Sequence, residues 1–387
     1  MRHLNPSLNR WNIGETVIRK MTRLAHEHGA VNLSQGLPDF DTPEIVKAAA
    51  SAAIAKGHNQ YSYTFGIPEL RRAIADTVIR FNHLTWVDPD DIVVTLGATE
   101  GIMSVLGTIA QPDDEVIFFE PFHESYVPQC RLLGLQPKAI PIVNRRYDPA
   151  ALEAAITDRT AAILLNTPHN PSGTVFGREA LEHIAGLARH HDLLVLTDEI
   201  YEHIVYGDAR HISIATLPGM RERTFTINAI SKTFAATGWR IGWAICPPQF
   251  TRYLRAVHDV TVIQAPTPLQ VAAVTALSMP DAYYRELAGY YLERRDLLVS
   301  ALQRVGFSCS APDGAYYVMA DFSALDANAT STEFAMKLLT EVKVAAVPGS
   351  NFYLTPGLGE HEVRFAFCKQ LETIHAAAAN LERYYRP

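Results

Sequence analysis

The sequence predicts an α/β fold in which a large domain is joined to a smaller α+β domain. A chain of 387 residues is long enough for two packed cores. Its middle alternates short apolar runs with longer amphipathic stretches, which is typical of parallel strands joined by helical crossovers. After Met279 and Pro280 this alternation gives way to a long charged helical stretch, and that change marks the expected boundary.

Six short apolar runs are the candidate strands of the large domain. They lie at residues 92–95, 115–120, 161–166, 193–197, 224–228 and 241–246. The intervening amphipathic stretches, among them residues 99–109, 149–156 and 178–190, are expected to be helices. We therefore expect one α/β domain over residues 43–280.

The remainder of the chain is expected to form the smaller domain. A charged helix is predicted over residues 281–302, a strand over 316–321, a helix near 332–342 and a last helix from Leu371. The N-terminal segment to about Ala30 has no strand pattern and is expected to pack against these elements. Residues 1–42 and 281–387 would then form one discontinuous α+β domain.

Composition narrows the functional classes. Hydrophobic residues make up 48% of the chain and charged residues 19%, as in ordinary globular proteins. The net charge of -7 disfavours nucleic acid and anionic membranes as partners, which favour basic surfaces. Because no secretory leader pattern or long apolar run is present, we expect a cytoplasmic protein. Four widely spaced cysteines predict free thiols and no metal site.

Lys232 is the strongest candidate for a reactive group. It closely follows an apolar strand, and open α/β folds bind ligands at the carboxyl ends of their strands. Partial burial and the cationic neighbour Arg240 would lower the pKa of its amine, so that the neutral form could attack an aldehyde. Ser231 and Arg240 offer a hydroxyl and a bidentate guanidinium, both suited to a phosphate. The alternative, a solvated surface lysine, fits an isolated Ser-Lys pair better.

Polar residues follow other candidate strands in the same way. Asp198 ends one strand, where its carboxylate would face the ligand crevice or cap a helix. Asn170 lies in a loop made rigid by two prolines and a glycine, where it could donate an amide hydrogen bond or belong to an ordinary turn. Ala98 and Thr99 begin a helix whose free N–H groups could hold a phosphate.

Two further residues have a functional and a structural interpretation. Phe122 follows the strand at 115–120 and could stack on a flat ring or belong to the core. Arg364 lies in an apolar, strand-like stretch, and a buried arginine needs an anionic partner. That partner is a carboxylate of a substrate or an acidic side chain of the protein.

Several of these segments resemble motifs of the class I and II aminotransferases, which depend on pyridoxal 5'-phosphate. Residues 231–242 resemble the family's cofactor-lysine motif, with the pattern Ser-Lys-Thr-x(4)-Gly-Trp-Arg-x-Gly. Residues 166–173, NTPHNPSG, resemble the loop N-x-x-x-N-P-x-G. The motifs occur in family order from Asn32 to Lys369. The strings QGLPDF, EPFHESY and HISIATLPGM are most similar to kynurenine, glutamine and methionine aminotransferases.

The resemblance implies the fold and the role of each candidate. It implies fold type I, with a mostly parallel seven-stranded sheet flanked by helices in the large domain. Lys232 would hold the cofactor as a Schiff base, Asp198 would keep the ring nitrogen protonated, and Asn170 and Tyr201 would donate to the ring oxygen. Arg364, with Asn170 and the backbone of Gly36, would bind the substrate.

The resemblance also implies a homodimer with shared sites. Tyr61 would reach the phosphate of the partner subunit's site, beside the groups from Ala98, Thr99, Ser231 and Arg240. This chain departs from the family at Ala229, where many relatives have a phosphate-binding serine.

The expected reaction moves an amino group from an L-amino acid to a 2-oxo acid. Aromatic, methionine-like or glutamine-like side chains are favoured over aspartate because no second arginine is evident. A β-lyase or another reaction on the same cofactor is the main alternative. A non-catalytic binding protein is disfavoured because Lys232, Asp198, Asn170 and Arg364 are all present.

Overall fold

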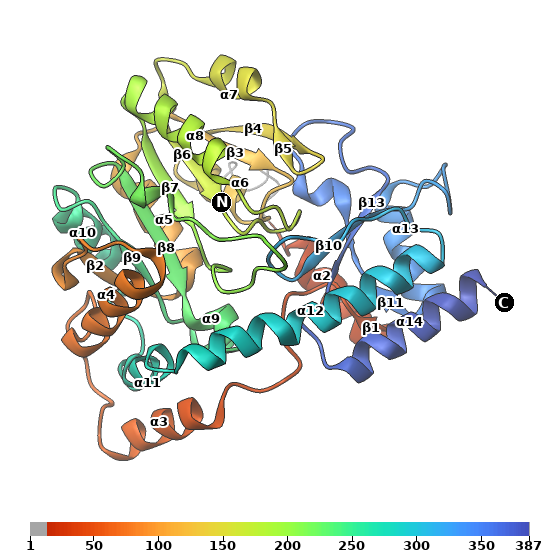
Figure 1. Ribbon diagram of the computed structural model, residues 1–387, viewed down its shortest axis with the longest axis horizontal. Helices are drawn as coiled ribbons and strands as arrows, with labels where there is room; N and C mark the ends of the chain where they lie inside the picture. The colour runs from red at the N-terminus through yellow and green to blue at the C-terminus, as the bar shows by residue number, and fades with distance from the viewer. Residues whose placement is uncertain (1–13, 387) are drawn as a thin grey trace, which may run out of the picture.

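The computed structural model describes residues 14–386 of the chain (Figure 1). Residues 1–13, which belong to the predicted small domain, lie outside the described range. The main helices are α2 (Val17–His28), α3 (Glu44–Ala55), α4 (Pro68–Asn82), α5 (Gly97–Ile109), α6 (Tyr126–Leu132), α7 (Pro149–Ala155), α8 (Arg178–His190), α9 (Ile230–Thr233), α10 (Thr251–Val262), α11 (Thr267–Leu277), α12 (Asp281–Arg304), α13 (Ser331–Lys337) and α14 (Leu371–Tyr385).

One large sheet forms the centre of the molecule. Its strands are β2 (Ile92–Thr95), β3 (Glu115–Glu120), β4 (Gln136–Val143), β5 (Arg146–Tyr147), β6 (Thr160–Asn166), β7 (Leu194–Asp198), β8 (Thr224–Ala229) and β9 (Gly242–Ile245). They lie in the order β2-β9-β8-β7-β6-β3-β4-β5. The central strands β8, β7, β6, β3 and β4 run parallel, whereas β9 is antiparallel to both of its neighbours.

Helices cover both faces of this sheet, as the continuous apolar strands require. Ile117 of β3 belongs to a buried cluster with Leu181 and Ile184 of α8. The next residue, Phe118, belongs to the cluster on the other face, which includes Ile102 of α5. The alternation along β3 therefore feeds two separate cores, one on each side of the sheet.

In the part of the chain that the structure describes, the sheet has eight strands rather than the seven expected. The additional strand, β5, pairs antiparallel with β4. Asn144 and Arg145 make this hairpin because both have a left-handed backbone, with φ of 50° and 62°. β4 was itself absent from the candidate strands, since Pro137, Lys138 and Pro141 interrupt its apolar pattern.

Two smaller sheets follow in the C-terminal part of the chain. One has the order β10-β13-β12, formed by β10 (Tyr317–Asp321), β13 (Glu362–Ala366) and β12 (Val347–Pro348). In the other, β1 (Val31–Asn32) pairs in parallel with β11 (Val344–Ala345). Ile18 of α2 packs with Val347 and Phe352, so α2 lies against this part of the molecule.

The long helix α12 runs from α11, beside the large sheet, to the smaller strands (Figure 1). Among residues 14–386, the strands of the large sheet come from residues 92–245, and those of the smaller sheets from residues 31–32 and 317–366. This distribution supports the domain limits 43–280 and 1–42 with 281–387, which stay a prediction. Within the described residues, no helix combines the length and apolar character needed to cross a membrane.

Candidate active site

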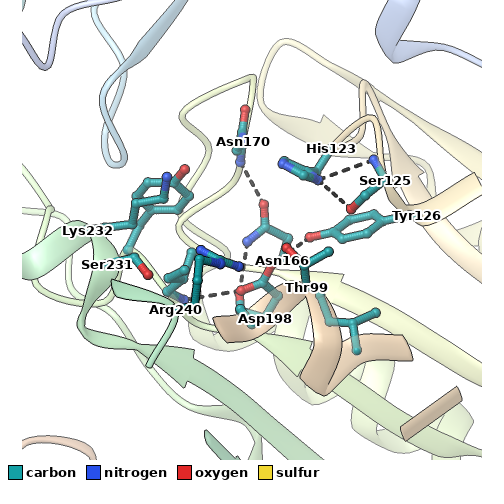
Figure 2. Close-up of a pocket in the computed structure, with 14 residues that line it drawn as sticks. Thr99, His123, Ser125, Tyr126, Asn166, Asn170, Asp198, Ser231, Lys232 and Arg240 are labelled. Carbon is teal, nitrogen blue, oxygen red and sulfur yellow. Dashed lines mark hydrogen bonds between the residues drawn. The ribbon is translucent and has the colours of Figure 1, made fainter. Parts of the chain in front are cut away.

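A pocket opens at the carboxyl ends of the central parallel strands, beside the N-terminus of α5 (Figure 2). This edge is where open α/β sheets bind ligands. The pocket is lined by Ala98, Thr99, Ile102, His123, Ser125, Tyr126, Asn166, Asn170, Asp198, Ile200, Tyr201, Ser231, Lys232 and Arg240. Eight of these side chains or backbone positions were site candidates from the sequence, so distant motifs meet in one place.

Lys232 enters the pocket from the single-turn helix α9, directly after β8. Its Nζ lies 3.4 Å from the carbonyl oxygen of Gly36. Burial lowers the pKa of this amine to about 8, and the charges of Arg240 and Arg364 act in the same direction. A substantial fraction of Lys232 is therefore a neutral nucleophile at moderately alkaline pH.

Asp198 ends β7 and is buried. Its Oδ2 accepts a hydrogen bond of 2.8 Å from the phenol of Tyr126, and its Oδ1 accepts the N–H of Ile200 at 3.3 Å. No helix begins at Asp198, so the alternative of a helix cap is wrong. Burial raises the pKa of Asp198 to about 6, although the hydrogen bond from Tyr126 opposes that shift.

The loop after β6 is tied to β7 and to the small-domain strands. The amide of Asn166 donates to the carbonyl oxygen of Asp198 at 2.8 Å and accepts the N–H of Asn170 at 2.7 Å. Asn170 Oδ1 in turn accepts a hydrogen bond of 3.1 Å from Arg364. The two N–H groups of Asn170 Nδ2 can then point into the pocket, as the predicted bond to a ring oxygen requires.

The N-terminus of α5 is shaped to receive an anion. Its preceding residue, Leu96, makes no side-chain cap, which leaves the first N–H groups of a 13-residue helix free for another acceptor. Arg240 lies over this end, and a Cβ on Gly97 would come within 2.3 Å of its Nη2. A Cβ on Gly242 would lie 2.9 Å from the backbone nitrogen of Ala98. Two glycines thus keep this cradle open.

Arg364 lies on β13, where it is 1% exposed. Its Nη2 donates to the carbonyl oxygen of Ser34 at 2.8 Å, and its guanidinium stacks on Tyr317. Its Nε has no partner, and none of the ion pairs among residues 14–386 includes it. The alternative, a salt bridge from Arg364 to an acidic side chain of the protein, is therefore wrong. The guanidinium of Arg364 is left to pair with an anionic ligand.

The chain matches known proteins over nearly its full length. The model of the family "Aminotransferase class I and II" matches residues 28–381. The chain belongs to the class I and II aminotransferases.

Named relatives agree with this assignment. The chain is 39% identical to a probable N-succinyldiaminopimelate aminotransferase from Mycobacterium tuberculosis, covering 95% of each chain. It is 34% identical to human kynurenine--oxoglutarate transaminase 1, covering 94% of each, and to the methionine aminotransferase of Escherichia coli, covering 96% of each. The solved structure of the M. tuberculosis N-succinyldiaminopimelate aminotransferase superimposes with a TM-score of 0.94 at 38% identity, over 99% of this chain and 100% of that one.

Fold type I and the expected resemblance to kynurenine and methionine aminotransferases are thus confirmed. The higher identity to the N-succinyldiaminopimelate aminotransferase was not expected from the motifs. The enzyme is a pyridoxal-phosphate-dependent aminotransferase.

The residues of this aminotransferase fit its cofactor. Ser231 Oγ is buried at the phosphate end without a hydrogen-bond partner. With the free N–H groups of α5 and the guanidinium of Arg240, it supplies donors for a phosphate. At the other end, Asp198 would offer a carboxylate to the ring nitrogen, and Lys232 would offer an amine to the aldehyde. These residues are the ones that would hold the cofactor.

Phe122 does not line this pocket. Its side chain is buried against Phe118, with ring centroids 4.9 Å apart, so the core interpretation of Phe122 is the correct one. The next residue, His123, lies in the pocket instead. Because its Nδ1 accepts the N–H of Ser125 at 3.3 Å, the proton of the neutral ring is on Nε2. Burial lowers the pKa of His123 to about 3, which keeps the ring neutral.

Gly36 and Tyr61 also lie outside the pocket lining. Gly36 is next to it, because its carbonyl oxygen faces Lys232, and a Cβ there would come within 1.9 Å of the Tyr317 hydroxyl. Tyr61 is 77% exposed, and its predicted role concerns the partner's site. Tyr201 does line the pocket, with its hydroxyl 3.1 Å from that of Tyr317.

Sequence reasoning missed three lining residues that this structure makes prominent: His123, Asn166 and the hydroxyl of Tyr126. A search for polar residues one or two positions beyond each strand would have found Asn166. His123 and Tyr126 could not be placed in the pocket without knowing the path of the chain after β3, and the sequence pattern does not give that path.

Proposed function

We propose that this aminotransferase takes its amino group from L-amino acids with aromatic, methionine-like or glutamine-like side chains. The composition of the pocket carries this proposal. Among the described residues that line it, Lys232 and Arg240 are the cationic side chains, and Arg240 lies at the phosphate end. Arg364 is adjacent and free for the α-carboxylate, which leaves no second guanidinium for a side-chain carboxylate. Relatives named for methionine and kynurenine fit this preference.

Each predicted site residue then has a distinct task. When bound, pyridoxal phosphate withdraws electrons from the substrate and makes its Cα–H bond acidic. Arg364 and Asn170 hold the substrate carboxylate and so orient that bond. Lys232, as a neutral amine, would remove the Cα proton and deliver it to the C4′ carbon of the cofactor, so that hydrolysis releases a 2-oxo acid. Asp198 keeps a proton on the ring nitrogen, and Tyr201 donates to the ring oxygen.

N-succinyldiaminopimelate is a second candidate substrate because the relative named for it has the higher identity. Such a substrate carries carboxylates far from the reacting amine, and these need cationic partners. In the described chain those partners would have to come from outside the pocket lining. The β-lyase alternative uses the same residues, and only its products distinguish it.

We further propose that the enzyme is a cytoplasmic homodimer. The exposed Tyr61 and Tyr63 support a partner at this surface, because large aromatic side chains gain most from burial in an interface. The three cysteines Cys130, Cys246 and Cys368 are buried free thiols, which suits a reducing compartment.

The first experiment compares wild type with Lys232→Ala after reconstitution with pyridoxal phosphate. The wild type is expected to show an absorption band of lysine-bound cofactor that the variant lacks. Lys138→Ala is the matched control, because Lys138 donates to Glu115 and Ala155 away from the pocket. It should retain the band.

Activity is then measured with a panel of amino acids, including N-succinyldiaminopimelate, and 2-oxoglutarate or pyruvate as acceptor. Keto-acid formation that requires the acceptor, with higher kcat/KM for the aromatic, methionine and glutamine donors, supports the proposal. A higher kcat/KM for N-succinyldiaminopimelate would replace the first substrate class by the second. Ammonia release without an acceptor would identify a lyase.

A further inference from the structure

The hydroxyl of Tyr126 contacts Asp198 at the end of β7. In the structure its phenol donates to Asp198 Oδ2 at 2.8 Å, and both side chains are buried. The second hydrogen bond to this carboxylate, from the N–H of Ile200, is longer at 3.3 Å. Tyr126 is thus the nearest donor to Asp198 within the described residues.

The surrounding fold holds this phenol in place. Tyr126 is the first residue of α6, and it is 1% exposed. Its ring packs near those of Phe118 and His123, with centroid distances of 6.5 and 5.5 Å. Figure 2 shows the hydroxyl directed at the carboxylate of Asp198 from the side opposite Lys232. The contact therefore joins α6 to the end of β7.

The charges around Asp198 leave it dependent on such a donor. Lys232 favours the ionised carboxylate, whereas burial and the neighbouring Glu199 disfavour it. The other titratable groups in the pocket are His123, Tyr201 and Arg240, and the lining residues from α5 do not titrate. Burial and the charge of Asp198 raise the pKa of Tyr126 well above its usual value, so the phenol keeps its proton.

We propose that Tyr126 is a positioning residue for transamination, which keeps Asp198 ionised and directed at the ring nitrogen of the cofactor. This inference rests on the proposed role of Asp198. A hydrogen bond from a neutral phenol stabilises the carboxylate without neutralising it, so Asp198 can still pair with a protonated ring nitrogen. Through this hydrogen bond, α6 would help to position the carboxylate that faces the ring nitrogen.

The first test is an infrared titration of the apoenzyme, which needs no cofactor. The protonated carboxyl signal of Asp198 is identified by its loss in Asp198→Asn. In Tyr126→Phe the pKa of Asp198 should rise by about one to two units, as expected for loss of a hydrogen bond to a charged group. Tyr206→Phe is the matched control, because its buried phenol donates to the carbonyl oxygen of Ala315. It should leave the titration unchanged.

The second test is a double-mutant cycle in the holoenzyme. Tyr126→Phe should lower kcat at pH 7 by about tenfold, with little change in KM. In the Asp198→Asn background the same substitution should have no further effect, because the phenol acts only through that carboxylate. Equal losses in both backgrounds, or an unchanged Asp198 pKa in the apoenzyme, would overturn the inference. Either outcome is compatible with a lysine-bound cofactor and leaves the proposed function standing.

Discussion

At the scale of single residues, burial makes the charged forms of two pocket side chains less favourable than they are in water. Asp198 and Lys232 are both shifted towards neutrality by burial, to pKa values of about 6 and about 8. Such opposed shifts are typical of catalytic sites, where an acid and a base must both work near neutral pH. Keeping these two groups in a buried pocket lowers the stability of the apoenzyme.

Asp198→Asn should therefore stabilise the apoenzyme while abolishing most of its activity. The pKa of Asp198 is raised by burial from 3.8 to about 6, so the folded state binds this proton more tightly than the unfolded state. The free-energy penalty for ionising the buried Asp198 carboxyl is absent below pH 4, grows between pH 4 and 6 and is complete above pH 6. The substitution should gain about 3 kcal/mol at pH 8 and roughly half of that at pH 5. Thermal melting at the two pH values measures the difference, and an equal gain at both would contradict this account.

At the scale of elements, the phosphate end of the pocket depends on close approach of three backbones. The N-terminus of α5, strand β9 and the loop that carries Arg240 meet where Gly97 and Gly242 have no side chain. Gly97 also has a φ of +74°, which an L residue adopts only with strain. A strand–glycine–helix pattern is common in sequences. Here the position of Arg240 beside Gly97 is what makes the helix N-terminus suited to a phosphate.

Gly97→Ala should weaken cofactor binding far more than a second glycine substitution in the same helix. The new Cβ would displace the guanidinium of Arg240 and strain the start of α5, so the dissociation constant should rise at least about tenfold. Gly107→Ala is the control, since Gly107 is exposed in the interior of α5 and its nearest neighbour lies 3.6 Å away. It should raise stability by about 1 kcal/mol and leave binding unchanged. Titration of both apoenzymes with pyridoxal phosphate measures the two dissociation constants. Equal affinities would contradict the proposal that Gly97 keeps the phosphate end of the pocket open.

Strand prediction succeeded where burial made the pattern continuous. The strands β3, β6, β7 and β8 are buried on both faces, and their apolar runs lie within one or two residues of the expected limits. β4 is partly exposed and carries two prolines, which is tolerated near the edge of the sheet but hides it from a search for apolar runs.

At the scale of the whole molecule, exposed apolar side chains mark the surface that we propose for the dimer. Tyr61 and Tyr63 precede α4, and Val260 and Ile263 lie at the end of α10. These two segments are neighbours, because the N–H of Ser62 donates to Gln264 Oε1 at 2.8 Å. Ile263 has a φ of +68°, which is rare for a β-branched residue and is frequent at functional contacts.

Mixing two inactive variants should test whether Tyr61 acts in the partner's site. Tyr61→Ala should bind the cofactor weakly, and Lys232→Ala cannot form the lysine-bound cofactor. A hybrid dimer would contain one site with wild-type Tyr61 and Lys232, so dissociation and reassembly of the mixture should restore activity, up to about a quarter of wild type for random pairing. Restoration is measured against each variant reassembled alone. No gain in the mixture would place Tyr61 in its own subunit's site or remove it from catalysis.

The sequence alone was sufficient for the family, the fold class and the residues that follow the central strands. Lys232, Asp198, Asn170 and the start of α5 share one location because parallel strands end at the same edge of a sheet. Their chemistry is set by residue type, so a pattern along the chain predicts it.

Contacts between segments far apart in sequence were decided only by the tertiary structure. Whether Phe122 or His123 faces the pocket depends on how the chain turns after β3, and the sequence placed the wrong one of the two there. The bond from Tyr126 to Asp198 joins residues 72 positions apart, and that from Arg364 to Asn170 joins residues 194 apart. No local propensity specifies such pairs, because they form only when packing of the whole chain fixes the distance between two elements.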